Sequence, residues 1–195
     1  IRYYDIMDTE AIIRVTQDAR GAFCKWKNID LSERATYMRS LGRIMRKNKE
    51  QYAKIITEEM GKPLRQSIAE IEKCAWVCDY YSEHAESFLR DELVPTEFRK
   101  SFVSFEPLGV IACIMPWNFP FWQVMRFAAP VITAGNVAIL KHSSVCLGSS
   151  LEIAQAFRDA GFPENVFQVV LGDYRTGESL LQCDIDAVSV TGSVS

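Results

Sequence analysis

The chain has 195 residues and a formal net charge of -3 at pH 7. Without an excess of Lys and Arg it offers no surface for the phosphates of a nucleic acid. No apolar run approaches the roughly 20 residues of a membrane helix, and residues 1–11 lack the basic start and apolar centre of a signal peptide. We therefore expect a cytoplasmic protein with neither a nucleic-acid nor a membrane partner.

The cysteines show no spacing typical of a disulfide framework, which predicts reduced thiols. Cys74 and Cys78 stand four residues apart on a predicted helix and could share a metal ion. However, only His84 and His142 could supply imidazole ligands, and neither has the spacing of a zinc site. We expect buried or half-buried thiols and no metal. The cysteines are Cys24, Cys74, Cys78, Cys113, Cys146 and Cys183.

The two ends of the chain suggest a fragment of a longer protein. The chain opens at Ile1 rather than at a methionine, and it stops at residues 191–195, directly after an apolar, strand-like run. A core strand with nothing to cover it is an uncommon end for a domain. We expect further chain after Ser195.

The first 93 residues carry the apolar periodicity of helices. Ser32 is a candidate N-cap for the second helix, and Asn48 with Gln51 has the form of a capping box for the third, which ends at Gly61. The apolar stripes of the first two helices run over residues 12–26 and 37–45, the third helix lies between Asn48 and Gly61, and the fourth covers residues 64–89.

The pattern changes after Val94-Pro95. Residues 100–106 alternate as in a strand, and short apolar strands then alternate with helices, which is typical of a parallel sheet covered on both faces. We therefore predict an α/β fold: a helical part (1–93), a strand pair (94–108) and an incomplete Rossmann-like domain (109–195). The predicted elements are strands 110–115, 137–140, 166–171 and 187–190 and helices 121–134, 145–160 and 176–183.

The residues that follow each predicted strand are the candidate ligand-binding residues, because ligands of such sheets bind beyond the carboxyl ends of the strands. No GxGxxG motif is present. Taken alone, Lys141 could be a surface lysine and Gly192-Ser193 a plain turn. The loop Pro116–Pro120 is more distinctive, because its prolines hold the side chain of Asn118 in one orientation. The segments are Pro116–Pro120, Lys141–Ser144, Gly172-Asp173 and Thr191–Ser193.

Pro-Trp-Asn-Phe-Pro after one strand, a lysine-containing turn one strand later and Thr-Gly-Ser at the end resemble the aldehyde dehydrogenase superfamily. Upstream, Glu59-Met60-Gly61-Lys62-Pro63 fits the same pattern. The resemblance covers essentially the whole chain. Within the superfamily, residues 116–126 and Lys141-His142 look most similar to bacterial succinate-semialdehyde dehydrogenases.

The resemblance implies a mechanism in which a cysteine thiolate attacks the aldehyde, and the oxyanion of the thiohemiacetal needs a donor. The side-chain amide of Asn118 would be that donor; the alternative is an amide that braces its own loop. By similarity, Lys141 would reach the adenosine ribose and Ser193 the pyrophosphate of NAD or NADP. The other implied cofactor-binding residues are Ile114, Met115, Pro116, Trp117, Asn118, His142, Ser143, Ser144, Gly172 and Gly192.

The choice between NAD and NADP turns on Ser144. Family members that prefer NAD often carry a glutamate there, which would repel a 2′-phosphate. Serine tolerates NADP. His142 could help to bind the phosphate when protonated, but the sequence favours a packing role.

Arg126 stands eight residues after Asn118, where succinate-semialdehyde dehydrogenases anchor the substrate carboxylate. A guanidinium suits that group because it makes two parallel hydrogen bonds. The alternative is an arginine paired with a buried acid. Trp122 would form part of the substrate tunnel wall.

Two departures from the family pattern bear on activity. Phe127 stands where many members carry a lysine, and no cysteine of this chain lies in the nucleophile's sequence context. The implied parent oxidises succinate semialdehyde or a near homologue as a dimer or tetramer, with the strand pair as the oligomerisation element. The alternative is a non-catalytic remnant that at most binds nucleotide, and we expect the isolated chain to be inactive.

Overall fold

The apolar periodicity of the N-terminal part produces four helices in the computed structural model, which describes residues 3–192. Each helix buries one stripe of side chains, such as Met38, Leu41 and Met45 in the second helix. The four predicted helices are confirmed within a few residues at each end. They are α1 (Thr9–Trp26), α2 (Leu31–Lys47), α3 (Lys49–Met60) and α4 (Leu64–Leu89).

Strands and helices alternate in the remainder of the described chain and build a four-stranded parallel sheet of order β5-β4-β3-β6. All six residues of β4 are buried, as the continuous apolar strands predicted. The predicted α/β class is confirmed. The elements are β3 (Val110–Met115), α5 (Pro120–Thr133), β4 (Val137–His142), α6 (Leu147–Asp159), β5 (Phe167–Val170), α7 (Tyr174–Leu181) and β6 (Ala187–Val190).

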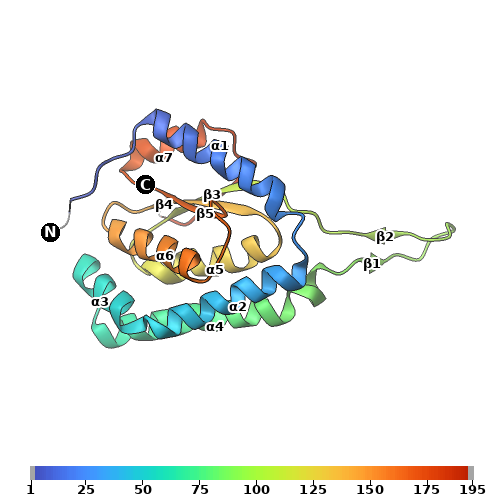
Figure 1. Cartoon of the computed structure of the whole chain (residues 1–195), viewed down its shortest axis with the longest axis horizontal. Helices are drawn as coiled ribbons and strands as arrows, with labels where there is room; N and C mark the ends of the chain where they lie inside the picture. Colours follow the sequence, from blue (N-terminus) through green and yellow to red (C-terminus); the bar gives the residue numbers. More distant parts are fainter. Residues whose placement is uncertain (1–2, 193–195) are drawn as a thin grey trace.

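The helices form layers on both faces of the sheet (Figure 1). α1 and α7 cover one face, α5 and α6 cover the other, and α2, α3 and α4 pack outside α5 and α6. Trp26 joins two of these layers, because its indole Nε1 donates to the carbonyl of Ile132 at 2.9 Å. The N-terminal helices therefore share one hydrophobic core with the sheet.

The predicted start of α2 is wrong, and the start of α3 is confirmed without its predicted capping box. α2 begins at Leu31 with Asp30 at its N-cap, so Ser32 already lies in the first turn. Asn48 does hold the N-cap of α3, but its amide donates to the hydroxyl of Tyr52 at 3.1 Å and caps no backbone N–H group. Gln51, the other half of the predicted capping box, instead donates to Glu152 of α6 at 3.2 Å, so neither predicted cap forms.

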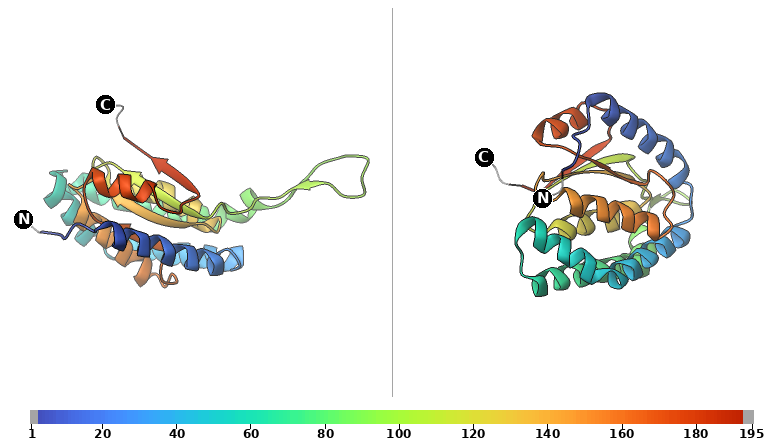
Figure 2. Two further views of the ribbon diagram at one scale, coloured as in Figure 1. Left: turned by 90° about the horizontal axis from the view of Figure 1, so that it is seen from above. Right: turned by 60° about the vertical axis from the view of Figure 1, so that its left-hand side comes forward.

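A two-stranded arm projects from the layered body (Figures 1 and 2). β1 (Glu92–Leu93) pairs antiparallel with β2 (Phe102–Val103), a shorter strand than the alternation over residues 100–106 predicted. Several large apolar side chains of the arm are exposed. They are Leu93, Phe98, Phe102, Val103 and Phe105.

In the described residues, no helix is long and apolar enough to cross a membrane. The same part of the chain holds no group of three or more potential metal ligands.

Candidate active site

The carboxyl ends of three neighbouring strands meet at one edge of the sheet. Ile114 of β3 pairs with Lys141 of β4 on one side and with Val190 of β6 on the other. Because the strands are parallel, the segments that follow them lie at the same edge. These segments are residues 116–120, 143–144 and 191–192, and Ser193, the predicted pyrophosphate ligand, lies outside the described residues.

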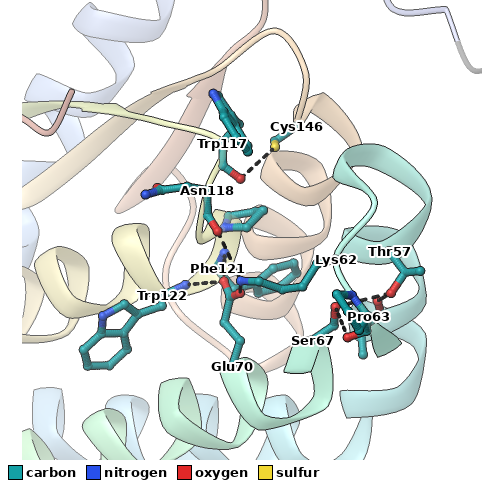
Figure 3. Close-up of polar contacts among 12 residues, drawn as sticks. Thr57, Lys62, Pro63, Ser67, Glu70, Trp117, Asn118, Phe121, Trp122 and Cys146 are labelled. Atoms are coloured by element: carbon teal, nitrogen blue, oxygen red, sulfur yellow. Dashed lines mark hydrogen bonds and ion pairs between the residues drawn. The ribbon is translucent and has the colours of Figure 1, made fainter. Parts of the chain in front are cut away.

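Asn118 lies at the exposed tip of the loop that follows β3. Its backbone carbonyl is held by Lys62, while its side-chain amide points away from this contact (Figure 3). Among residues 3–192 that amide has no hydrogen-bond partner, so it does not brace its own loop. Trp117 beside it is also exposed, and the carbonyl of Trp117 accepts a weak bond from the Cys146 thiol at 3.8 Å. The loop thus presents an unpaired amide at the edge of the sheet.

A buried ion pair lies directly beneath this loop (Figure 3). Lys62, between α3 and α4, pairs with Glu70 of α4, and their side chains are only 8% and 1% exposed. Glu70 Oε1 accepts from the backbone N–H groups of Phe121 and Trp122 at 2.9 and 3.0 Å. Glu70 therefore caps α5, whose own N-cap residue supplies no side-chain bond.

Lys141 is the candidate cofactor ligand that the structure places most clearly. It is the penultimate residue of β4 rather than part of a turn, because that strand continues two residues beyond the predicted end. Its side chain packs along Gly177 and is nearly buried, and burial lowers its pKa while the charge of Asp173 opposes this shift. In the described chain its ammonium has no hydrogen-bond or ion-pair partner. A ligand hydroxyl or phosphate oxygen would satisfy this partly desolvated group.

His142 is a packing residue in this structure, as the favoured prediction had it, and its place among the cofactor-binding candidates finds no support. The ring is fully buried; Nε2 donates to the carbonyl of Pro120 at 2.9 Å, and Nδ1 accepts from the N–H group of Ser143 at 2.8 Å. Burial lowers the pKa of His142 to about 4. A neutral imidazole with both nitrogens engaged has nothing to offer a phosphate.

Ser144 is exposed and borders a cavity of about 470 Å³ between α3, the start of α6 and the N-terminal segment. Glu58 and Glu59 line the same cavity. Glu59 accepts from the backbone N–H groups of Gly148 and Ser149 at 2.6 and 2.9 Å, so it caps α6.

Carboxylates therefore cap all three helices that follow strands of the sheet in the described chain. Glu70 caps α5, Glu59 caps α6, and Asp173 caps α7 through the N–H group of Arg175 at 2.9 Å. An anionic ligand cannot use these N-termini without displacing a carboxylate. This leaves Lys141 and the segment after β6 for a phosphate-bearing ligand.

The two glycines among the candidates differ in environment. Gly172 adopts φ +154°, and a Cβ atom there would lie 1.8 Å from Thr176 Oγ1, so packing alone requires glycine. Gly192 is exposed and has no heavy atom within 4 Å of a built Cβ. Only Gly192 is open to a ligand.

A protein-family model for the aldehyde dehydrogenase family matches residues 2–195. The chain belongs to the aldehyde dehydrogenase family. It is 44% identical over 176 residues to a probable succinate-semialdehyde dehydrogenase [NADP(+)] of Synechocystis sp., a match that covers 90% of this chain and 39% of the relative. A succinate semialdehyde dehydrogenase [NAD(P)+] of Escherichia coli is 43% identical over 180 residues, covering 91% and 39%.

The fold is also that of solved aldehyde dehydrogenases. The crystal structure of succinic semialdehyde dehydrogenase from Streptococcus pyogenes in complex with NADP+ superimposes with a TM-score of 0.91 at 29% identity, covering 96% of this chain and 42% of that one. This chain therefore spans about two fifths of the aldehyde dehydrogenases that it matches.

Arg126 and Trp122, the candidate substrate-binding residues, lie one turn apart on α5. Arg126 is exposed, and its Nη2 donates to Thr191 Oγ1, just after β6, at 3.1 Å. Within residues 3–192 Arg126 pairs with no acid, so the alternative of an arginine paired with a buried acid is not observed. Trp122 is half-buried and stacks under the ammonium of Lys73, 3.9 Å from its ring centroid.

Four of the six cysteines are buried with a raised pKa, and Cys24 is exposed on α1, which covers the sheet face opposite α5. Burial raises the pKa of Cys74, Cys78 and Cys113 well above the ordinary thiol value and raises that of Cys146 to about 12. Cys183 follows α7, on the sheet face opposite α5 and its loop. A nucleophilic thiolate needs a lowered pKa and access, which buried thiols lack.

The sequence patterns did not reveal the role of Glu70. Its partners in α5 lie 51 and 52 residues further along the chain, so no local motif marks the contact. One signal was available: a carboxylate directly before Ile71 on the buried face of an amphipathic helix requires a partner.

Proposed function

We propose that this chain is the cofactor-binding part of an aldehyde dehydrogenase that oxidises succinate semialdehyde, or a close carboxylated aldehyde such as glutarate semialdehyde, with NAD or NADP. Residues 109–195 would form the NAD(P)-binding domain, residues 1–93 its helical part and residues 94–108 the arm of a homodimer or homotetramer. The observation that carries the proposal is that two strand ends at the same edge of the sheet present the side-chain amide of Asn118 and the ammonium of Lys141, neither of which has a partner among residues 3–192.

Membership of the family assigns Asn118 the role of oxyanion donor, and its exposure and its lack of a partner among residues 3–192 are compatible with that role. A donor that is already oriented stabilises negative charge that develops on a carbonyl oxygen, without reorganisation during the reaction. A preorganised amide at the end of β3 fits this requirement. The thiol that attacks the aldehyde would come from outside this chain.

The proposed cofactor would supply the hydride acceptor. Lys141 suits a ribose hydroxyl because its ammonium is partly desolvated and unpaired in the described chain. Gly192 and the residues after it would approach the pyrophosphate, since the N-termini of α5, α6 and α7 are already capped.

Replacement of Asn118 by alanine tests the proposal in a full-length enzyme that contains this segment. We expect kcat to fall by about 10² to 10³ while the dissociation constant for NADP stays within about threefold, because the amide acts on the transition state. Asn28→Ala is a matched control, since Asn28 makes only a local bond to the carbonyl of Cys24. An unchanged kcat in Asn118→Ala would refute the proposed role.

Substrate choice is proposed to rest on Arg126. Arg126→Leu should raise KM for succinate semialdehyde by at least about tenfold, because a charge-assisted pair of hydrogen bonds contributes about 1.5–3 kcal/mol. The KM of an uncharged aldehyde of similar length should change much less. Arg158→Leu on α6, whose guanidinium bonds only to Gln155, is the control. Equal increases for both aldehydes would remove the carboxylate-anchor role.

A further inference from the structure

We propose that the buried Lys62–Glu70 pair is a positioning device that holds the oxyanion donor Asn118 in its reactive orientation. This inference rests on the proposed function, because it assigns the pair a role in the same site. Lys62 and Glu70 are positioning residues rather than catalytic ones, since neither would touch the substrate.

The two residues hold the loop after β3 at its tip and at its junction with α5. Lys62 Nζ donates to the carbonyl of Asn118 at 3.1 Å and lies 3.7 Å from the centroid of the Phe119 ring. Glu70 accepts a second bond from Lys62 and further bonds from the N–H groups of Phe121 and Trp122. Every polar contact of the pair that leaves the pair itself ends on residues 118–122 (Figure 3).

The residues on either side of Lys62 restrain its backbone. Gly61 ends α3 in the left-handed conformation, with φ +75°, and Pro63 restricts the backbone where α4 begins. The backbone at Lys62 is therefore restrained. The ion pair with Glu70 then restricts the position of the Lys62 ammonium.

Fold stability alone gives a weak reason for such a pair. Removal of two charges from water costs several kcal/mol per ion, and replacing buried pairs by apolar residues is often neutral or stabilising. Glu70 alone could cap α5. The contact between Lys62 and the Asn118 carbonyl adds nothing to that cap, but it fixes the peptide that carries the catalytic amide.

The orientation of Asn118 needs this support. Pro116 and Pro120 restrain the ends of the loop, yet residues 117–119 are exposed. A reacting group must be held within about 0.5 Å and 10–20° of its productive geometry. A displacement of about 1 Å can cost about a hundredfold in rate.

The test is a double-mutant cycle in a full-length enzyme that contains this segment. Lys62→Met removes the ammonium at similar volume and should lower kcat by about tenfold to a hundredfold, with KM and NADP affinity within about threefold. In an Asn118→Ala background the same substitution should change kcat by less than about twofold, because the amide it positions is already absent. Lys49→Met is the matched control: it breaks a second Lys–Glu pair between α3 and α4, but an exposed one.

A second variant separates the loop contact from the unpaired charge that Lys62→Met leaves in the core. Combining Lys62→Met with Glu70→Gln leaves no charge at either position, and the side-chain carbonyl of the introduced glutamine can still cap α5. This double variant should show the same loss of kcat while its melting temperature stays within a few degrees of the parent. The positioning role would be overturned if Lys62→Met lowered kcat equally in the parent and in the Asn118→Ala background. It would also be overturned if the double variant Lys62→Met with Glu70→Gln showed no loss of kcat. If Asn118→Ala itself were fully active, the proposed function would fail instead.

Discussion

Burial, rather than residue type, decides what His142 can do. A histidine near the end of a strand could bind a phosphate, yet the ring of His142 is fully buried and links the carbonyl of Pro120 to the backbone N–H group of Ser143. Its pKa falls to about 4 because burial disfavours the charged form, although its bond to Pro120 opposes the shift. His142 therefore connects the loop after β3 to the end of β4.

This shift predicts acid sensitivity of the fold. Between pH 6.5 and pH 4 the unfolded chain binds a proton at His142 and the folded chain does not, so stability falls as pH falls through this window. We expect the free energy of unfolding to be about 2 kcal/mol lower at pH 5 than at pH 7. Urea unfolding should show this loss in the parent and in His84→Gln, whose histidine is exposed. His142→Gln should lose most of the pH difference, whatever its absolute stability; if it does not, another group controls the transition.

The candidate site residues that the sequence identified lie at the end of a predicted strand or follow closely after it. Asn118 lies in the loop after β3 and Arg126 lies on the helix after that loop, as the predicted elements indicated, while their roles stay predictions. Lys141 was expected in a turn, because a polar residue after an apolar run resembles the end of a strand. The structure extends β4 across it, and only the pairing of Lys141 with Ile114 and Val170 reveals this.

At the scale of elements, helix starts depend on distant carboxylates. α6 was expected to begin at Val145 but begins at Leu147, and its N-cap residue Cys146 makes no side-chain bond. Glu59 of α3 supplies the cap instead, through Gly148 and Ser149. A helix start that depends on a distant carboxylate cannot be predicted from the local sequence. By contrast, the predicted bounds of strands 110–115 and 187–190 agree with the structure at every residue, because continuous apolar runs mark them.

The cap by Glu59 should have a measurable energy. Glu59→Ala leaves two N–H groups and the Ser149 hydroxyl without their acceptor, so we expect unfolding to need about 1–2 kcal/mol less. Glu59→Gln should lose less, because its carbonyl still accepts. Glu58→Ala is the control: this neighbour makes only a long ion pair with Lys54 at 3.8 Å, so its effect should stay within about 0.5 kcal/mol. Similar losses at both positions, measured by urea unfolding, would show that α6 does not depend on this cap.

At the scale of the whole molecule, the sheet is covered unevenly. In the described chain β5 and β6 are the two edge strands of the sheet, and β6 is the more exposed of them. Val188 and Val190 of β6 are 43% and 64% exposed. Figure 2 shows β6 at the margin of the body, well away from the arm. An edge strand with exposed valines is a template for pairing with another chain.

We therefore expect the 195-residue protein to self-associate through β6. Lysine at exposed positions of an edge strand opposes strand addition by charge repulsion and by the cost of burying an ammonium. Val188→Lys with Val190→Lys should lower light scattering at a given concentration and temperature, with little change in circular dichroism. Tyr174→Lys, at a residue that is 69% exposed on α7, changes the net charge away from this edge and should have a smaller effect. If the Tyr174 variant suppressed scattering as strongly, net charge rather than the edge of β6 would control association.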